Sequence, residues 1–156
     1  MKIHLLAVGV RMPEWVEKGY AEYAGRLPRE CTLRLIEVPP GRRGAHADVA
    51  RIVQAEGERL LAAVPAGSRL IALDERGQQW STMELAGRLA GWLGEGRDVS
   101  LLVGGPDGLD ADCRARANAL WSLSRLTLPH PLVRVVVAEQ IYRAWSVLHN
   151  HPYHRA

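Results

Sequence analysis

The chain has 156 residues, 47% of them hydrophobic and 24% charged, which is typical of one globular domain that forms its core without disulfides or a metal. No apolar run reaches the roughly 18 residues that a membrane span needs. The formal net charge of +3 is carried almost wholly by arginine, with lysine only at Lys2 and Lys18, which indicates either phosphate contacts or a compositional bias.

The first ten residues become polar too soon for a secretory signal, so we expect a cytoplasmic protein. In that compartment the two distant cysteines, Cys31 and Cys113, are expected to be reduced thiols. A catalytic cysteine is the alternative, but no motif around either residue supplies the base that such a nucleophile needs.

Apolar runs alternate with segments of helical period along the whole chain. We expect, in chain order, a strand at 3–8, a helix at 14–26, a strand at 32–38, a helix at 47–64, a strand at 69–73, a helix from 81 to about 93, a strand at 98–103, a helix at 110–119, a strand-like run at 123–128 and a helix from 132 to about 150. This order predicts a single α/β domain over residues 1–156 with a mostly parallel sheet. The continuous apolar run VSLLV agrees, because parallel strands are covered on both faces.

Local signals support several of these boundaries. Pro13 is placed as a first helical residue. Ser81 and Glu84 have the spacing of a capping box, which opens the third helix. The run Pro39-Pro40-Gly41 ends the second strand, and it begins an irregular stretch over residues 39–48. Arg42, Arg43 and His46 make that stretch either an RNA-backbone contact or an ordinary solvated loop.

Ligands of parallel α/β sheets bind beyond the carboxyl ends of the strands, and three such ends are unusual here. They are LIALDE at 70–75, VGGPDGL at 103–109 and LSRLTLPHPL at 123–132. The glycine turn lacks the spacing of a dinucleotide fingerprint and the lysine of a P-loop, but its adjacent glycines let a backbone approach a ligand closely. A tight turn without a ligand would look the same. The two prolines around His130 make a stiff turn that presents backbone groups to a ligand such as an adenine ring, or simply lead into the last helix.

The last helix is apolar around most of its circumference, which indicates burial on more than one side and, in so small a chain, a subunit interface. Its polar residues follow helical spacing, at Glu139, Arg143, Ser146 and Asn150. Glu139 and Arg143 form an i,i+4 pair, so the stripe is either a structural ion pair or a polar line that faces a catalytic cleft.

The tail HNHPYHRA carries three histidines but no cysteine or carboxylate that would complete a metal site. Stacking by Tyr153 and phosphate contact by Arg155 suit RNA better. A disordered terminus is the third interpretation.

Four stretches together resemble one known family: RMPEWVEKGYAEYAGRLP, IEVPPGRRG, LLVGGPDGL and, above all, LTLPHPLVRVVVAEQIYRAWSVLHNHPYHR. Over nearly the whole chain the sequence is similar to the small bacterial SPOUT methyltransferases of the RlmH type, which methylate N3 of a pseudouridine in large-subunit (23S) ribosomal RNA. The resemblance implies a parallel α/β sheet whose C-terminal part forms a trefoil knot. Spacing alone argues against a threaded chain.

The resemblance also implies a homodimer that binds S-adenosylmethionine in the knot and needs no metal. The cofactor contacts would be largely backbone contacts at Leu73, Gly104, Leu123, Ser124, Arg125, Leu126, Thr127 and Leu128.

Candidate catalytic residues are His130, Glu139, Arg143, Tyr153, His154 and Arg155, with a cation expected to stabilise the developing anion of the base. We expect the tail of one subunit to complete the site of the other, and the assembled ribosome or large subunit to be the substrate. Two other classes remain open: a non-catalytic ribosome-binding or RNA-binding factor, and a small-molecule α/β enzyme such as a hydrolase. The hydrolase is disfavoured because no Ser/His/Asp set, P-loop or metal cluster is evident.

Overall fold

In the computed structural model, which describes residues 1–155, strands and helices alternate along the chain as expected. The elements are β1 (Lys2–Val8), α1 (Glu14–Ala24), β2 (Thr32–Val38), α2 (Val49–Ala63), β3 (Arg69–Gln79), α3 (Thr82–Glu95), β4 (Val99–Val103), α4 (Ala111–Arg116), β5 (Ala119–Ser122) and α5 (His130–Leu148). None of the helices among the described residues is long and apolar enough to cross a membrane.

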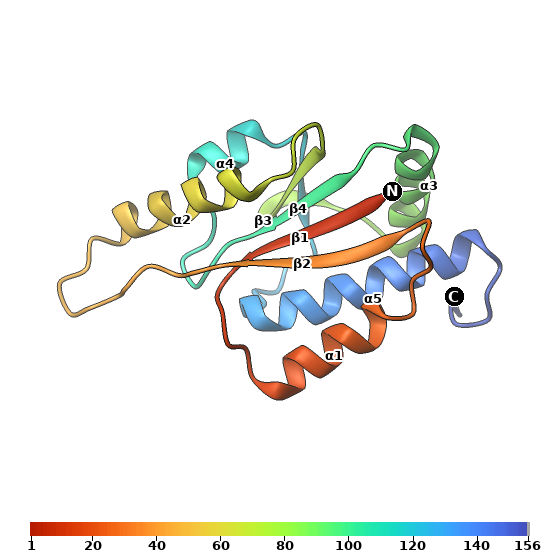
Figure 1. Cartoon of the computed structure of the whole chain (residues 1–156), viewed down its shortest axis with the longest axis horizontal. Coiled ribbons are helices and arrows are strands. Elements are labelled where there is room, and N and C mark those ends of the chain that lie inside the picture. The colour runs from red at the N-terminus through yellow and green to blue at the C-terminus, as the bar shows by residue number, and fades with distance from the viewer. Residues whose placement is uncertain (156) are drawn as a thin grey trace.

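The five strands form one sheet in the order β2-β1-β4-β3-β5, and all four neighbouring pairs are parallel. Helices cover both faces: α1, α3 and α5 lie on one side, and α2 and α4 lie on the other (Figure 1). The predicted single α/β domain with a parallel sheet is therefore confirmed. All carboxyl ends of the strands consequently meet at one edge of the sheet.

Side-chain alternation along β1 shows why its sequence is continuously apolar. Ile3, Leu5 and Ala7 pack in the core with α3 and α5, whereas Leu6 and Val8 pack in the core with α2. Because successive side chains of a strand point to opposite faces, a strand that is covered on both faces has no polar positions to spare.

Several boundaries differ from the sequence prediction. The capping box at Ser81 and Glu84 is present, but Pro13 lies at the N-cap of α1 and not inside the helix. Helix α4 ends at Arg116, and the last strand is Ala119–Ser122 instead of the run at 123–128, which is an irregular loop. The side chain of Asn118 accepts a hydrogen bond from the Leu70 amide at 2.9 Å, and this contact draws the chain into the sheet earlier than its apolar pattern suggests.

Strand β3 is longer than the predicted 69–73 because it bulges and then continues. Its register with β5 shifts between Leu73 and Gln78, both of which pair with Trp121. A Cβ atom at Gly77 would lie 2.5 Å from the backbone carbon of Leu120, so only glycine permits this approach. The bulged residues project beyond the carboxyl edge of the sheet, where they help to line a cavity.

Both cysteines are buried and unpaired, which confirms two separate reduced thiols. Burial raises the pKa of Cys31 to about 11. Burial, followed by a hydrogen bond with Asp110, raises the pKa of Cys113 as well. Both features argue against the catalytic alternative for these cysteines, because such a nucleophile needs a lowered pKa.

Candidate functional site

A cavity of about 860 Å³ opens at the carboxyl edge of the sheet, and we call it the edge cavity. Its walls come from the bulged part of β3, from the segments that follow β4 and β5, from Arg114 of α4 and from the start of α5. Its volume is within the range of small-molecule sites, which is roughly 300–1,000 Å³. Most of the lining residues belong to the three unusual strand ends of the sequence, at 70–75, 103–109 and 123–132, which are well separated in the chain.

Seven of the eight residues predicted to bind a cofactor line the edge cavity, namely Leu73, Gly104, Leu123, Ser124, Leu126, Thr127 and Leu128. The eighth, Arg125, is exposed and is not part of the lining. The loop that holds most of them is fixed by Ser122, whose hydroxyl donates to the Ser124 carbonyl at 3.0 Å, and by Ser124, whose hydroxyl accepts from the Leu126 amide at 2.9 Å.

The glycine turn after β4 folds back on itself. The Gly108 amide donates to the Gly105 carbonyl at 3.0 Å, and Gly108 has a φ of +81°. A Cβ atom at Gly104 would lie 2.5 Å from the Gly108 carbonyl carbon and 2.8 Å from the Leu109 nitrogen. The turn is thus closed so tightly that position 104 has no room for a side chain, and its backbone is open to the edge cavity.

His130 is the first residue of α5, and it also lines the edge cavity. Its Nδ1 is buried without a hydrogen-bond partner. Burial, followed by the neighbouring Arg134 and Arg43, lowers the pKa of this imidazole, while Glu56 acts in the opposite direction. His130 is therefore neutral at physiological pH, where one ring nitrogen donates and the other accepts a hydrogen bond.

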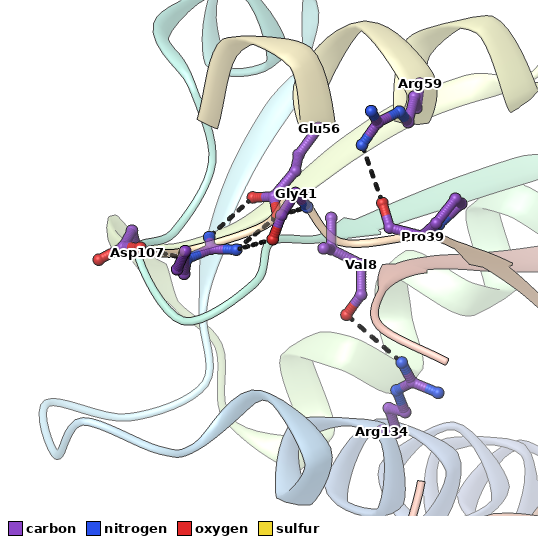
Figure 2. A network of polar contacts seen from close by, with 8 residues as sticks. Val8, Pro39, Gly41, Glu56, Arg59, Asp107 and Arg134 are labelled. Carbon is purple, nitrogen blue, oxygen red and sulfur yellow. Dashed lines mark hydrogen bonds and ion pairs between the residues drawn. The ribbon is translucent and has the colours of Figure 1, made fainter. Parts of the chain in front are cut away.

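The fully buried Arg134 supports this corner of the fold from behind. Its guanidinium donates to Glu37 at 2.6 Å and to the Gly9 carbonyl at 2.9 Å, and it also reaches the Val8 carbonyl (Figure 2). Val8 is the last residue of β1, Gly9 follows it, and Glu37 is the last but one residue of β2, so Arg134 fastens α5 to the ends of two strands.

Asp74 and Arg114 also line the edge cavity, but the sequence did not single them out as ligand-binding residues. Their charged groups lie 3.8 Å apart, and Arg114 donates to the Leu109 carbonyl at 2.6 Å. Nothing in the spacing of DERGQQW and DCRAR predicts this pair, because it depends on the β3 bulge.

A second group of predicted residues lies farther along α5 and in the tail. Glu139 accepts hydrogen bonds from Arg143 Nε at 2.8 Å and from the Tyr153 hydroxyl at 2.9 Å. The Arg143 guanidinium also lies over the Tyr153 ring, 4.9 Å from its centroid. We call Glu139, Arg143 and Tyr153 the tail cluster.

The hydrogen bond with Glu139 raises the pKa of Arg143. Burial, followed by the hydrogen bond with Glu139, raises the pKa of Tyr153. At neutral pH the tail cluster thus presents a cation and a protonated phenol.

The tail folds back onto α5, which contradicts a disordered terminus. The His151 amide donates to the Ser146 carbonyl at 2.9 Å, and the ring centroids of Tyr142 and Tyr153 are 4.7 Å apart. The prediction that Ser146 belongs to the polar stripe is wrong, because its hydroxyl is fully buried and donates to the Tyr142 carbonyl. Asn150 is exposed.

His154 and Arg155 follow the tail cluster, the former half-buried and the latter exposed. They lie at the far end of α5 from His130. Glu139 lies nine positions after His130, which corresponds to about 14 Å along a helix. Within one chain, the structure brings Glu139, Arg143 and Tyr153 together but keeps them apart from the edge cavity.

The irregular stretch 39–48 is not a uniform basic surface. Arg42 and His46 are exposed, but Arg43 is turned inward and binds Glu56 and Asp107, both of which are labelled in Figure 2. The prediction of an RNA contact is thus wrong for Arg43, whose donors are occupied within the chain. Among residues 1–155 there is also no group of three or more histidine, cysteine or carboxylate side chains arranged to hold a metal ion.

Comparison with known proteins agrees with this geometry. The family model described as "Predicted SPOUT methyltransferase" matches residues 1–154. Two curated relatives, each named Ribosomal RNA large subunit methyltransferase H, are 61% identical over 155 residues. The one from Thioalkalivibrio sulfidiphilus aligns over 99% of both chains, and the one from Methylococcus capsulatus over 99% of this chain and 100% of its own.

Solved structures share the fold at low identity. A probable methylase family protein from Haemophilus influenzae superposes with a TM-score of 0.54 at 13% identity, over 99% of this chain and 70% of its own. A structure that concerns 2-OH methylation of C/U34 on tRNA gives 0.51 at 20% identity, over 96% and 97% of the two chains. At these identities the likeness shows the fold alone.

Proposed function

The chain belongs to the SPOUT methyltransferase family, and on that basis we propose that it transfers a methyl group from S-adenosylmethionine to N3 of a pseudouridine in large-subunit (23S) ribosomal RNA. The observation that carries the proposal is the high identity, over almost the full length, to two relatives named as large-subunit ribosomal RNA methyltransferases. The trefoil knot of the family stays a prediction for this chain.

The edge cavity fits the cofactor in size and in character. Its lining combines apolar side chains such as Leu73 and Leu128 with the open backbone of Gly104, and such a mixture suits an adenosine with a polar tail. We propose that Leu73, Gly104 and the loop residues Leu123, Ser124, Leu126, Thr127 and Leu128 hold the cofactor, whereas Arg125 lies outside the lining. When bound, S-adenosylmethionine supplies an electrophilic methyl group at its sulfonium centre.

The tail cluster supplies groups that suit the target base. Loss of the N3 proton leaves negative charge on a pseudouridine, and a fixed cation stabilises such a charge. Glu139 holds both the Arg143 guanidinium and the Tyr153 hydroxyl, so neither has to reorganise when the base binds. We propose that Arg143, Tyr153, His154 and Arg155 face the base and that His130 acts from the cofactor side, with Glu139 as the orienting carboxylate.

The separation along α5 supports a site that is shared between two subunits. Reacting atoms must approach to about 3–3.5 Å, whereas the tail cluster begins about 14 Å from His130 along the helix. We propose that the chain forms a homodimer in which the tail of one copy completes the edge cavity of the other. The half-buried apolar side chains of α5, among them Leu132 and Val136, are available for that contact.

The proposed substrate is the assembled ribosome or large subunit, in the cytoplasm. A domain of this size has few elements that could read bases, so recognition rests on the shape of folded RNA and on phosphate contacts. Equal turnover of an isolated RNA stem-loop would contradict this part of the proposal.

The activity is tested by tritiated methyl transfer from S-adenosylmethionine to ribosomes that lack the modification, followed by mapping of the labelled nucleotide. We expect label at N3 of one pseudouridine of the large-subunit RNA. Titration calorimetry with S-adenosylmethionine separates the alternative of a non-catalytic RNA-binding factor, since that alternative predicts no binding.

The shared site is tested by mixing two inactive variants. Gly104→Ala disrupts the glycine turn of the edge cavity, and truncation after Asn150 removes the tail. If the site is shared, random mixing restores about a quarter of the sites, because half of the dimers are mixed and each of these has one intact site. Full activity of the truncated protein alone, or no recovery on mixing of folded variants, would overturn the shared site.

A further inference from the structure

A buried carboxylate in α2 organises the region next to the glycine turn. The Glu56 side chain is 2% exposed and accepts three hydrogen bonds: from the Gly41 amide at 2.9 Å, and from Arg43 at 2.9 Å and 3.1 Å. A buried carboxylate is stable only when it is paired and hydrogen-bonded. Glu56 therefore holds the start of the 39–48 stretch in one position.

The same arginine continues from Glu56 to the glycine turn. Arg43 Nε donates to Asp107 at 2.8 Å, so one guanidinium joins the carboxylate of α2 to the tip of the turn (Figure 2). Hydrogen bonds to Glu56 and Asp107 raise the pKa of Arg43, and it is a cation at any physiological pH. The planar fork of arginine makes both contacts at once, which the point charge of lysine would not.

The turn is held from its inner side as well. A Cβ atom at Gly105 would lie 3.1 Å from the Val8 side chain and 3.5 Å from Glu56 Oε1. The turn is therefore confined between Glu56 on one side and the Arg43 contact to Asp107 on the other. Its residues from Gly104 to Leu109 all line the edge cavity.

We propose that Arg43, Glu56 and Asp107 form a clamp that positions the glycine turn for the cofactor. The inference rests on the proposed function, since it assumes that the edge cavity binds S-adenosylmethionine. Arg43 and Glu56 act as positioning residues, because they reach the edge cavity only through Asp107 and Gly105. Cofactor affinity then depends on a side chain of the 39–48 stretch that lies outside the lining of the edge cavity.

The sharpest test is Asp107→Asn, which keeps the shape of the side chain, removes its charge and leaves the Glu56–Arg43 pair intact. Its matched control is Asp112→Asn, an exposed carboxylate of α4. We expect Asp107→Asn to raise the dissociation constant of S-adenosylmethionine about fivefold, and the KM for this cofactor similarly. The control should match wild type.

Arg43→Lys completes a double-mutant cycle, with Arg51→Lys in α2 as its control. The variant that carries both Asp107→Asn and Arg43→Lys should bind the cofactor no more weakly than Arg43→Lys alone, because both substitutions disrupt the same contact between Arg43 and Asp107. Loss of thermal stability without any change in cofactor affinity would mean that the contact is only structural and would overturn the clamp.

Hydrogen exchange provides a readout that does not depend on the cofactor. The Gly108 amide, which is bonded within the turn, should exchange faster in Asp107→Asn than in Asp112→Asn. If wild type fails to bind S-adenosylmethionine, the proposed function falls, and exchange still decides whether the clamp holds the turn. Equal exchange rates of the Gly108 amide in Asp107→Asn and Asp112→Asn would refute the clamp.

Discussion

Position 104 offers a test of the glycine turn in which a single methyl group is the whole perturbation. In Gly104→Ala the added Cβ would lie 2.5 to 2.8 Å from backbone atoms of Gly108 and Leu109. Backbone atoms cannot rotate away as a side chain does, so the turn has to open. Gly91→Ala in α3 is the matched control, because an added Cβ there meets nothing within 4 Å.

The two substitutions should change stability in opposite directions. Overpacking costs about 1–3 kcal/mol, and in a chain of this length each kcal/mol lowers Tm by about 2–4 °C. A helical alanine gains about 0.5–1 kcal/mol over glycine, so Gly91→Ala should melt slightly higher than wild type. Opening the turn also removes the backbone surface that the cofactor would contact, and affinity should fall by more than about tenfold, equivalent to about 1.4 kcal/mol.

Thermal melts and titration calorimetry with S-adenosylmethionine measure both effects on the same samples. The reasoning requires that Gly104→Ala remain folded at the temperature of the titration and bind poorly. If Gly104→Ala binds the cofactor as tightly as wild type does, the turn is not part of the cofactor site. If Gly91→Ala loses affinity equally, the effect of a methyl group is not local.

Three further predictions concern other residues. Tyr153→Phe removes the hydroxyl bonded to Glu139, so kcat for methyl transfer should fall about tenfold or more while calorimetric cofactor affinity stays unchanged; a fall in affinity alone would contradict its placement at the base. Cys31 and Cys113 should resist iodoacetamide in the folded protein and react at both sites after unfolding, as mass spectrometry would show, because burial raises the pKa of each thiol. Burial lowers the pKa of His130 below its ordinary value of about 6.5, so the unfolded state takes up the proton first and stability should fall between about pH 7 and pH 5. Urea titrations at several pH values should show that stability falls less with pH in His130→Asn than in wild type, and equal pH dependence of the two proteins would refute this assignment.

The fold was predictable wherever the pattern of local burial decides the structure. The strands at 3–8 and 98–103 were placed within one residue, because the sheet buries both faces of their apolar runs. The edge strand at 32–38 was placed to the residue from its apolar positions and from the Pro-Pro-Gly break that follows it. The apolar run at 123–128 has a similar composition but forms a loop. Its partner strand β3 is already occupied by Ala119–Ser122, which Asn118 draws into the sheet. Such competition between segments is a long-range effect that a local pattern does not contain.

The site was predictable to a similar extent. Glu139 and Arg143 were recognisable as a pair from their spacing along one helix. Arg43 was not, because its partners lie 13 and 64 residues away in the chain. Ser146 fits the helical spacing of the polar stripe, but its hydroxyl can bond to a carbonyl one turn earlier, and this allows it to be buried.

The distribution of charge explains why the edge cavity has no charged motif in the sequence. Near the cavity, Arg43 is neutralised by Glu56 and Asp107, and Arg114 lies against Asp74, so these arginines serve the protein itself. The exposed Arg42 and Arg155 lie outside the lining. Arg76 is exposed and does line the cavity, but most of the lining is backbone and apolar side chains. We therefore expect the proposed cofactor to be recognised chiefly by shape and backbone, whose sequence signature is glycine and proline. A polyanion would instead meet the exposed arginines, so raised salt should weaken RNA binding far more than cofactor binding.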